Sequence, residues 1–185
     1  MTETNPGTPD RTWVYVALAF VAFWGVYLVF FAPGGLRLEA EKPAGSRPAD
    51  YSWTLYDLDD APVEFSRFRG KTVFLNVWAT WCPPCVQEMP SIAKLASNPN
   101  LKDVAFVCVS VDDSSATVKR FLAGKSWPMT VLRAQNTPAA FSTQGIPATF
   151  LIAPDGRIAR SEVGSADWDD PKVISMLEGL ASRNP

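Results

Sequence analysis

Uninterrupted apolar runs of two lengths mark the chain. The longer run, residues 13–32, contains no charged residue, and a helix of that length spans roughly 30 Å, the thickness of a bilayer core. Aromatic residues near both of its ends are typical of membrane interfaces. The run therefore predicts one transmembrane helix over residues 12–32. A cleaved signal peptide would have a shorter apolar region and a small-residue cleavage site, and a buried soluble helix would have a polar face.

Shorter apolar runs predict the strands of an α/β domain. Thr72–Trp78 and Val104–Val111 are almost continuously apolar, which is typical of strands buried on both faces. Apolar residues recur at helical spacing after Cys82, and Pro90 is expected to kink that helix. The other predicted elements are a hairpin within 51–65, a helix capped by Ser114 or Ser115, strands at Met129–Leu132, Pro147–Ala153 and Arg157–Val163, and a last helix begun by Asp170 and Pro171. Strands alternating with helices predict a sheet covered by helices on both faces.

Proline, glycine and charge divide the rest of the chain. Residues 1–11 are a short polar tail, and residues 33–50 have the composition of a flexible tether. The folded domain is expected over residues 51–185. Basic residues are more frequent on the cytoplasmic side of a membrane span. Here Arg11 precedes the span and three basic residues follow it, which mildly favours a cytoplasmic C-terminal domain; they are Arg37, Lys42 and Arg47.

Composition excludes several classes of site. The 185 residues contain 17 Lys and Arg against 19 Asp and Glu, so no basic surface predicts a nucleic-acid partner. The chain has no histidine, which removes histidine acid–base chemistry and the usual zinc sites. Its three cysteines are too few for a four-cysteine metal site. We therefore expect no metal and no cofactor other than a redox-active disulfide.

Two of the cysteines, Cys82 and Cys85, are three positions apart in Trp-Cys-Pro-Pro-Cys. Cys82 follows a buried strand and opens a helix, whose free N–H groups and positive end favour a thiolate. Cys85 comes one turn later, close enough to form a disulfide with it. A structural disulfide usually joins distant segments, since so short a loop removes little chain entropy, and a metal site needs two more ligands. The context favours a redox pair.

The segments TVFLNVWATWCPPCVQEMP and GIPATFLIAPDGRI resemble the thioredoxin superfamily. Within it the chain is similar to TlpA/ResA-like membrane-anchored thiol–disulfide oxidoreductases, with DsbE-type proteins as near relatives. The resemblance covers residues 51–185 and implies a thioredoxin-like fold with an N-terminal hairpin and a central βα insertion. It also implies that Cys82 attacks and Cys85 resolves. Pro147 would be a cis-proline opposite the pair, where an ordinary strand-start proline is the alternative.

Other residues around the pair receive roles from the same resemblance. The predicted client-binding residues are Trp81, Pro83, Pro84, Ile146 and Pro147. Glu88 lies on the same helix face as Cys85, and ResA-like relatives carry an active-site glutamate there. It would take the proton of Cys85; a solvated surface charge is the alternative. Asn76 stands where thioredoxin has a buried aspartate and cannot take a proton. Cys108 is predicted to be a core cysteine.

The predicted function is reduction of disulfides in protein clients outside the cytoplasmic membrane, such as apocytochrome c or copper-site cysteines. The protein would be a single-pass protein of that (inner) membrane, with its catalytic domain on the periplasmic side. We prefer this side despite the basic-residue count, because a cytosolic thioredoxin system needs no tether. A membrane thiol protein would supply the electrons. The alternatives are a disulfide-forming oxidant, a copper-site assembly protein, which would need a histidine ligand, a peroxidase, and a redox-inactive scaffold.

Overall fold

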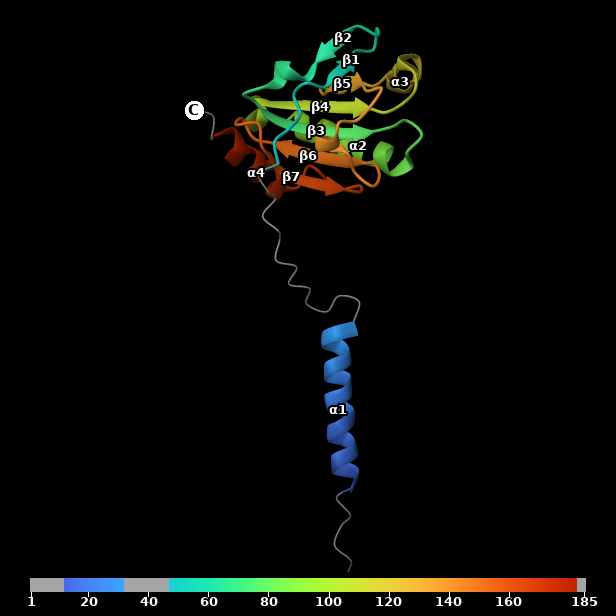
Figure 1. Ribbon diagram of the computed structural model, residues 1–185, viewed down its shortest axis with the longest axis vertical. Helices are drawn as coiled ribbons and strands as arrows, with labels where there is room; N and C mark the ends of the chain where they lie inside the picture. Colours follow the sequence, from blue (N-terminus) through green and yellow to red (C-terminus); the bar gives the residue numbers. More distant parts are fainter. Residues whose placement is uncertain (1–11, 32–46, 183–185) are drawn as a thin grey trace, which may run out of the picture. The chain divides into compact units, whose positions relative to one another are not determined.

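The computed structural model describes residues 12–31 and 47–182 (Figure 1). The chain divides into two compact units, residues 1–42 and 43–185, which we describe separately. The predicted polar tail, 1–11, lies outside the described residues, and so does most of the predicted tether, 33–50.

The described residues of the first unit form the helix α1 (Thr12–Phe31), which corresponds to the long apolar run. Over the described residues, no helix is long and apolar enough to cross a membrane. The predicted membrane anchor is therefore not confirmed and stays a prediction.

The second unit is built on a seven-stranded sheet with the order β2-β1-β5-β4-β3-β6-β7 (Figure 1). The strands are β1 (Thr54–Tyr56), β2 (Pro62–Glu64), β3 (Thr72–Trp78), β4 (Val104–Ser110), β5 (Thr130–Arg133), β6 (Ala148–Ile152) and β7 (Ile158–Val163). Only the pairs β3–β4 and β4–β5 are parallel. All seven residues of β3 are buried, as its continuous apolar run predicts. The predicted hairpin is confirmed as β1 and β2.

Three α-helices connect and cover these strands. They are α2 (Pro83–Ala96), α3 (Ser115–Leu122) and α4 (Pro171–Ala181), and short 3₁₀ turns occur at η1 (Phe65–Phe68), η2 (Pro99–Leu101) and η3 (Ala139–Phe141). The capping predictions are confirmed, since the side chains of Ser114 and Asp170 accept hydrogen bonds from backbone N–H groups of the first turns of α3 and α4. Helix α2 continues through Pro90. In the sequence, helix α3 and strand β5 come between β4 and β6, and they correspond to the expected central βα insertion.

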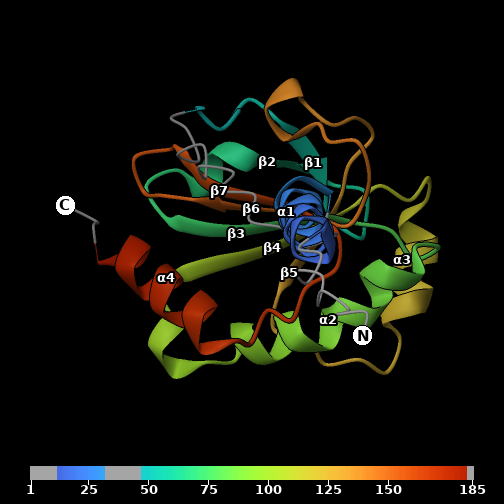
Figure 2. The same ribbon diagram turned by 90° about the horizontal axis from the view of Figure 1, so that it is seen from below.

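The core has two layers, one on each side of the sheet. The buried apolar side chains of α2, α3 and α4 all belong to one layer, and Figure 2 shows α2 and α4 together on one side of β3 and β4. The other layer is filled by η1, η3 and the aromatic side chains of Tyr51 and Trp53. The prediction of helices on both faces is therefore wrong. Aromatic residues close the second face, because Phe65, Trp53 and Phe141 pack on one another there.

This arrangement places the cysteine pair at one edge of the sheet. Helix α2 starts just after β3, and the carboxyl ends of the parallel strands β3, β4 and β5 lie on that same edge. Crevices at the carboxyl ends of parallel strands are the usual ligand sites of α/β folds.

Candidate functional site

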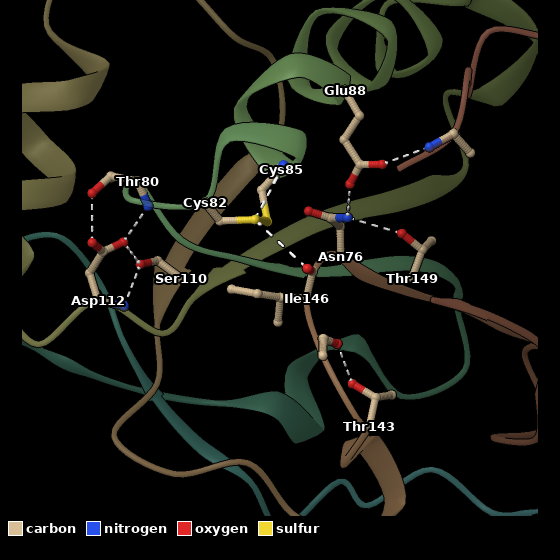
Figure 3. Close-up of a disulfide and its surroundings, with 12 residues drawn as sticks. Asn76, Thr80, Cys82, Cys85, Glu88, Ser110, Asp112, Thr143, Ile146 and Thr149 are labelled. Carbon is tan, nitrogen blue, oxygen red and sulfur yellow. Dashed lines mark hydrogen bonds between the residues drawn. A yellow bond between two sulfur atoms is a disulfide. The ribbon is translucent and has the colours of Figure 1, made fainter. Parts of the chain in front are cut away.

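The cysteine pair forms a disulfide at the start of α2 (Figure 3). Cys82 is the N-cap residue, and its Sγ accepts a hydrogen bond from the backbone N–H of Cys85, 3.3 Å away. Pro83 and Pro84 lack N–H groups, so this is the first helical N–H that can point at the sulfur. The same N–H would stabilise a thiolate on Cys82 in the reduced protein. Cys82 is 5% exposed and Cys85 is fully buried, which fits an outer attacking sulfur and an inner resolving one.

The surface around Cys82 combines exposed apolar groups with the backbone of the loop at Ile146 and Pro147. Trp81 is 66% exposed, and Pro83 and Pro84 are exposed as well. The peptide bond between Ile146 and Pro147 is cis, as the resemblance implies. The carbonyl oxygen of Ile146 lies 3.8 Å from Cys82 Sγ. The structure thus brings all five predicted client-binding residues to the neighbourhood of the pair.

Glu88 lies in the interior and is only 2% exposed, so the interpretation as a solvated surface charge is wrong. Its Oε2 accepts hydrogen bonds from the indole Nε1–H of Trp168 at 2.9 Å and the backbone N–H of Ala166 at 3.1 Å. Its Oε1 accepts one from Asn76 Nδ2 at 2.8 Å. Burial raises the pKa of Glu88, and these three hydrogen bonds oppose the rise. A carboxylate whose pKa is raised in this way is a stronger proton acceptor than an exposed one.

A second buried carboxylate fixes the loop that leads into the pair. Asp112 accepts hydrogen bonds from the backbone N–H of Thr80 at 2.9 Å and from its hydroxyl at 2.6 Å. The hydroxyl of Ser110 also donates to it at 2.6 Å. Thr80 is two residues before Cys82, so Asp112 ties the start of the pair to the end of β4 (Figure 3).

Sequence reasoning missed the roles of Asp112 and Trp168. The Thr80–Asp112 contact joins residues 32 positions apart and the Trp168–Glu88 contact residues 80 positions apart. No local pattern marks either contact. Trp168 stands alone among polar residues in the sequence, yet it is 4% exposed. A lone aromatic residue in a polar loop before a helix was the only signal available.

The third cysteine takes no part in the pair. Cys108 is a free thiol with no exposed surface, which confirms the prediction of a core cysteine. Burial raises the pKa of its thiol strongly, and the nearby Glu88 carboxylate adds to the rise. In the part of the chain that the structure describes, no three His, Cys, Asp or Glu side chains are grouped so that they could hold a metal ion.

Comparison with known proteins identifies the family. The redoxin family profile matches residues 42–177. The chain belongs to the redoxin family. Thiol-disulfide oxidoreductase ResA of Halalkalibacterium halodurans is 32% identical over 140 residues, which cover 75% of this redoxin and 76% of that protein. ResA of Geobacillus thermodenitrificans is 30% identical over 167 residues, which cover 88% of this redoxin and 90% of that protein. This redoxin is thus a thiol–disulfide oxidoreductase of the thioredoxin-like type.

Solved structures support the same assignment. A thiol:disulfide interchange protein of the thioredoxin family from Chlorobium tepidum TLS matches with a TM-score of 0.59 and 26% identity, covering 73% of this redoxin and 99% of that chain. The structure of MTB dsbF in its mixed oxidised and reduced forms matches with a TM-score of 0.60 and 25% identity, covering 70% of this redoxin and 98% of that chain.

Proposed function

We propose that Cys82 and Cys85 carry the thiol–disulfide exchange of this redoxin, with Cys82 as the attacking sulfur and Cys85 as the resolving one. The observation that carries this assignment is the position of the pair at the start of α2. There Cys82 receives the first available helical N–H, while Cys85 is fully buried, as is the carboxylate of Glu88 three residues further along the helix.

The reaction begins from the dithiol. The Cys82 thiolate attacks one sulfur of a client disulfide, the client S–S bond breaks, and the released client thiolate takes a proton from solvent. A mixed disulfide now joins Cys82 to the client. The Cys85 thiol loses its proton, and its thiolate attacks Cys82 Sγ and releases the second client sulfur as a thiolate, which also takes up a proton. The client has gained two electrons and two protons, and the pair has become the disulfide.

Glu88 is the proposed proton acceptor for Cys85. The two residues are three positions apart on α2, so they share a helix face, and Asn76 holds the carboxylate in the interior. A thiol in a dry interior loses its proton only if a base lies nearby, and no histidine exists in the chain to serve. The raised pKa of Glu88 brings the carboxyl group closer to the thiol in proton affinity.

The proposed substrates are disulfides in extended segments of protein clients. Trp81, Pro83 and Pro84 offer exposed apolar contacts, and the cis-proline loop presents the backbone of Ile146 beside the reactive sulfur. An extended client strand would pair with that backbone. Its amide hydrogen bonds are independent of side-chain identity, which suits a client such as an apocytochrome c or a copper-site protein outside the cytoplasmic membrane. A thiol protein in the membrane would reduce the pair again.

The reduction potential of the pair decides the direction of the reaction. The full chain in detergent is equilibrated with glutathione or dithiothreitol buffers, and the disulfide fraction is counted by alkylation. We expect a value near that of thioredoxin, about −270 mV, because the protein is proposed to reduce its clients. A value near about −120 mV would make it an oxidant. The absence of any reversible couple would leave only a scaffold role.

Residues 12–32 are the proposed membrane tether. The segment has no charged residue, and a helix of its length matches a bilayer core of roughly 30 Å. The full chain should stay in the membrane pellet after an alkaline carbonate wash, whereas a variant lacking residues 12–32 should be released. Protease added outside spheroplasts should digest the catalytic domain. Protection of that domain from protease would place it in the cytoplasm and contradict the proposed location.

A further inference from the structure

The Asn76 side-chain amide lies between the cysteine pair and Glu88. Asn76 comes from the middle of β3 and has no exposed surface. Its Nδ2 donates two hydrogen bonds, to Glu88 Oε1 at 2.8 Å and to Thr149 Oγ1 at 2.9 Å. Figure 3 shows Nδ2 turned toward Glu88 and Oδ1 turned toward the sulfurs of the pair. One amide thus faces both the proposed acid–base group and the reactive disulfide.

The Oδ1 atom of Asn76 is buried and accepts no hydrogen bond from any residue that the structure describes. A buried acceptor without a donor is costly, so native interiors nearly always satisfy it. Turning the amide over would not help, because Oδ1 would then face the carboxylate oxygen of Glu88. The orientation of the amide is therefore fixed by Glu88 and Thr149, and Oδ1 stays directed at the sulfurs.

The disulfide state explains the missing donor. The sulfurs of Cys82 and Cys85 carry no hydrogen when they are bonded to each other. Reduction adds two electrons and two protons, and the S–S bond is replaced by two S–H groups. Cys82 is held as the thiolate by the N–H of Cys85 and releases its proton to solvent. Cys85 is fully buried, so its new S–H group needs an acceptor inside the protein.

We propose that Asn76 is a positioning residue whose Oδ1 accepts a hydrogen bond from the Cys85 thiol in the dithiol state. This inference rests on the proposed roles of the pair and deepens them. The hydrogen bond keeps the proton on Cys85 and leaves the thiolate on Cys82, so only the outer sulfur attacks the client. It also holds Cys85 beside the carboxylate that later receives its proton, because the same amide binds Glu88. The bond exists only in the dithiol and therefore stabilises the reduced protein.

Infrared spectroscopy of the S–H stretch tests the contact directly. In the full chain with Cys82→Ala and Cys108→Ala, Cys85 carries the only thiol. Adding Asn76→Leu should move its S–H band to the higher frequency of a free thiol. Thr149→Val is the matched control, since it removes the other partner of Nδ2 and leaves Oδ1 in place; its band should stay where it was. An S–H band unmoved by Asn76→Leu would overturn the proposal. This readout needs no activity, so it stands even if the proposed function fails.

The thiol–disulfide equilibrium gives a second readout in the chain with all three cysteines. Asn76→Leu should shift the equilibrium against glutathione toward the disulfide by about fivefold, the worth of one ordinary hydrogen bond. A merely structural role would destabilise both redox forms alike and leave the ratio unchanged. Asn76→Ala repeats the test without a branched side chain if the leucine variant does not fold. An unchanged ratio, or a shift toward the dithiol, would contradict the proposal.

Discussion

Cys82→Ser should lower the rate of disulfide reduction by about three orders of magnitude or more, whereas Cys85→Ser should stop the reaction one step later, at a covalent adduct with the client. The difference follows from where the two sulfurs lie. Cys82 receives the N–H of Cys85 and is beside the exposed Trp81 and the loop at Ile146. Cys85 is fully buried and can reach only the sulfur of Cys82.

Non-reducing electrophoresis and mass spectrometry separate these outcomes. Each reduced variant is mixed with a disulfide-bonded test protein such as insulin. Cys85→Ser should accumulate the mixed disulfide, and Cys82→Ser should give none. Cys108→Ala is the matched control, because Cys108 is a third thiol buried away from the surface; it should react at close to the parent rate. An adduct on Cys85 in the Cys82→Ser variant would reverse the assigned roles.

The sequence predicts the features that depend on neighbouring residues. The almost continuous apolar run of Thr72–Trp78 is sufficient to predict a strand buried on both faces, and it is the interior strand β3. The start of α4 follows from Asp170 and Pro171, because a cap and a first-turn proline are local signals. The cysteine pair can likewise be predicted from neighbouring residues. Its spacing alone brings the sulfurs within bonding reach at the start of a helix.

Features that depend on contacts between distant residues could not be predicted from the sequence in this way. Periodicity tells which side of a helix is buried but not which face of the sheet it covers, so the prediction of helices on both faces was wrong. Glu88 stayed undecided between two interpretations because its burial is completed by Trp168, which is 80 positions away. The Asp112 contact to Thr80 likewise forms only when β4 lies beside β3. The most informative groups of the site are thus those that the fold, and not the local sequence, brings together.

Glu88→Gln should slow resolution of the mixed disulfide by about a hundredfold near neutral pH, the usual worth of one positioned proton acceptor. Glutamine keeps an oxygen for the Trp168 indole and the Ala166 N–H, but it cannot take the proton of Cys85. The thiol must then lose its proton to solvent, so the rate should rise steeply with pH in the variant. Release of client from the preformed adduct is followed in stopped flow. Glu64→Gln, on exposed β2, is the matched control and should behave like the parent.

The same substitution should change how stability depends on pH. Burial raises the pKa of Glu88 above the value of 4.5 that applies when the group is exposed, so between these two pKa values the folded state binds more protons than the unfolded state. The free energy of unfolding therefore falls as pH rises through that window and levels off above it. Glu88→Gln lacks this loss, so the variant should gain stability relative to the parent as pH rises. Urea unfolding of both oxidised proteins between pH 4 and pH 8 measures the difference. Parallel profiles would mean that Glu88 binds its proton no more tightly in the folded state than in the unfolded state. That result would contradict the proposal that Glu88 is the proton acceptor.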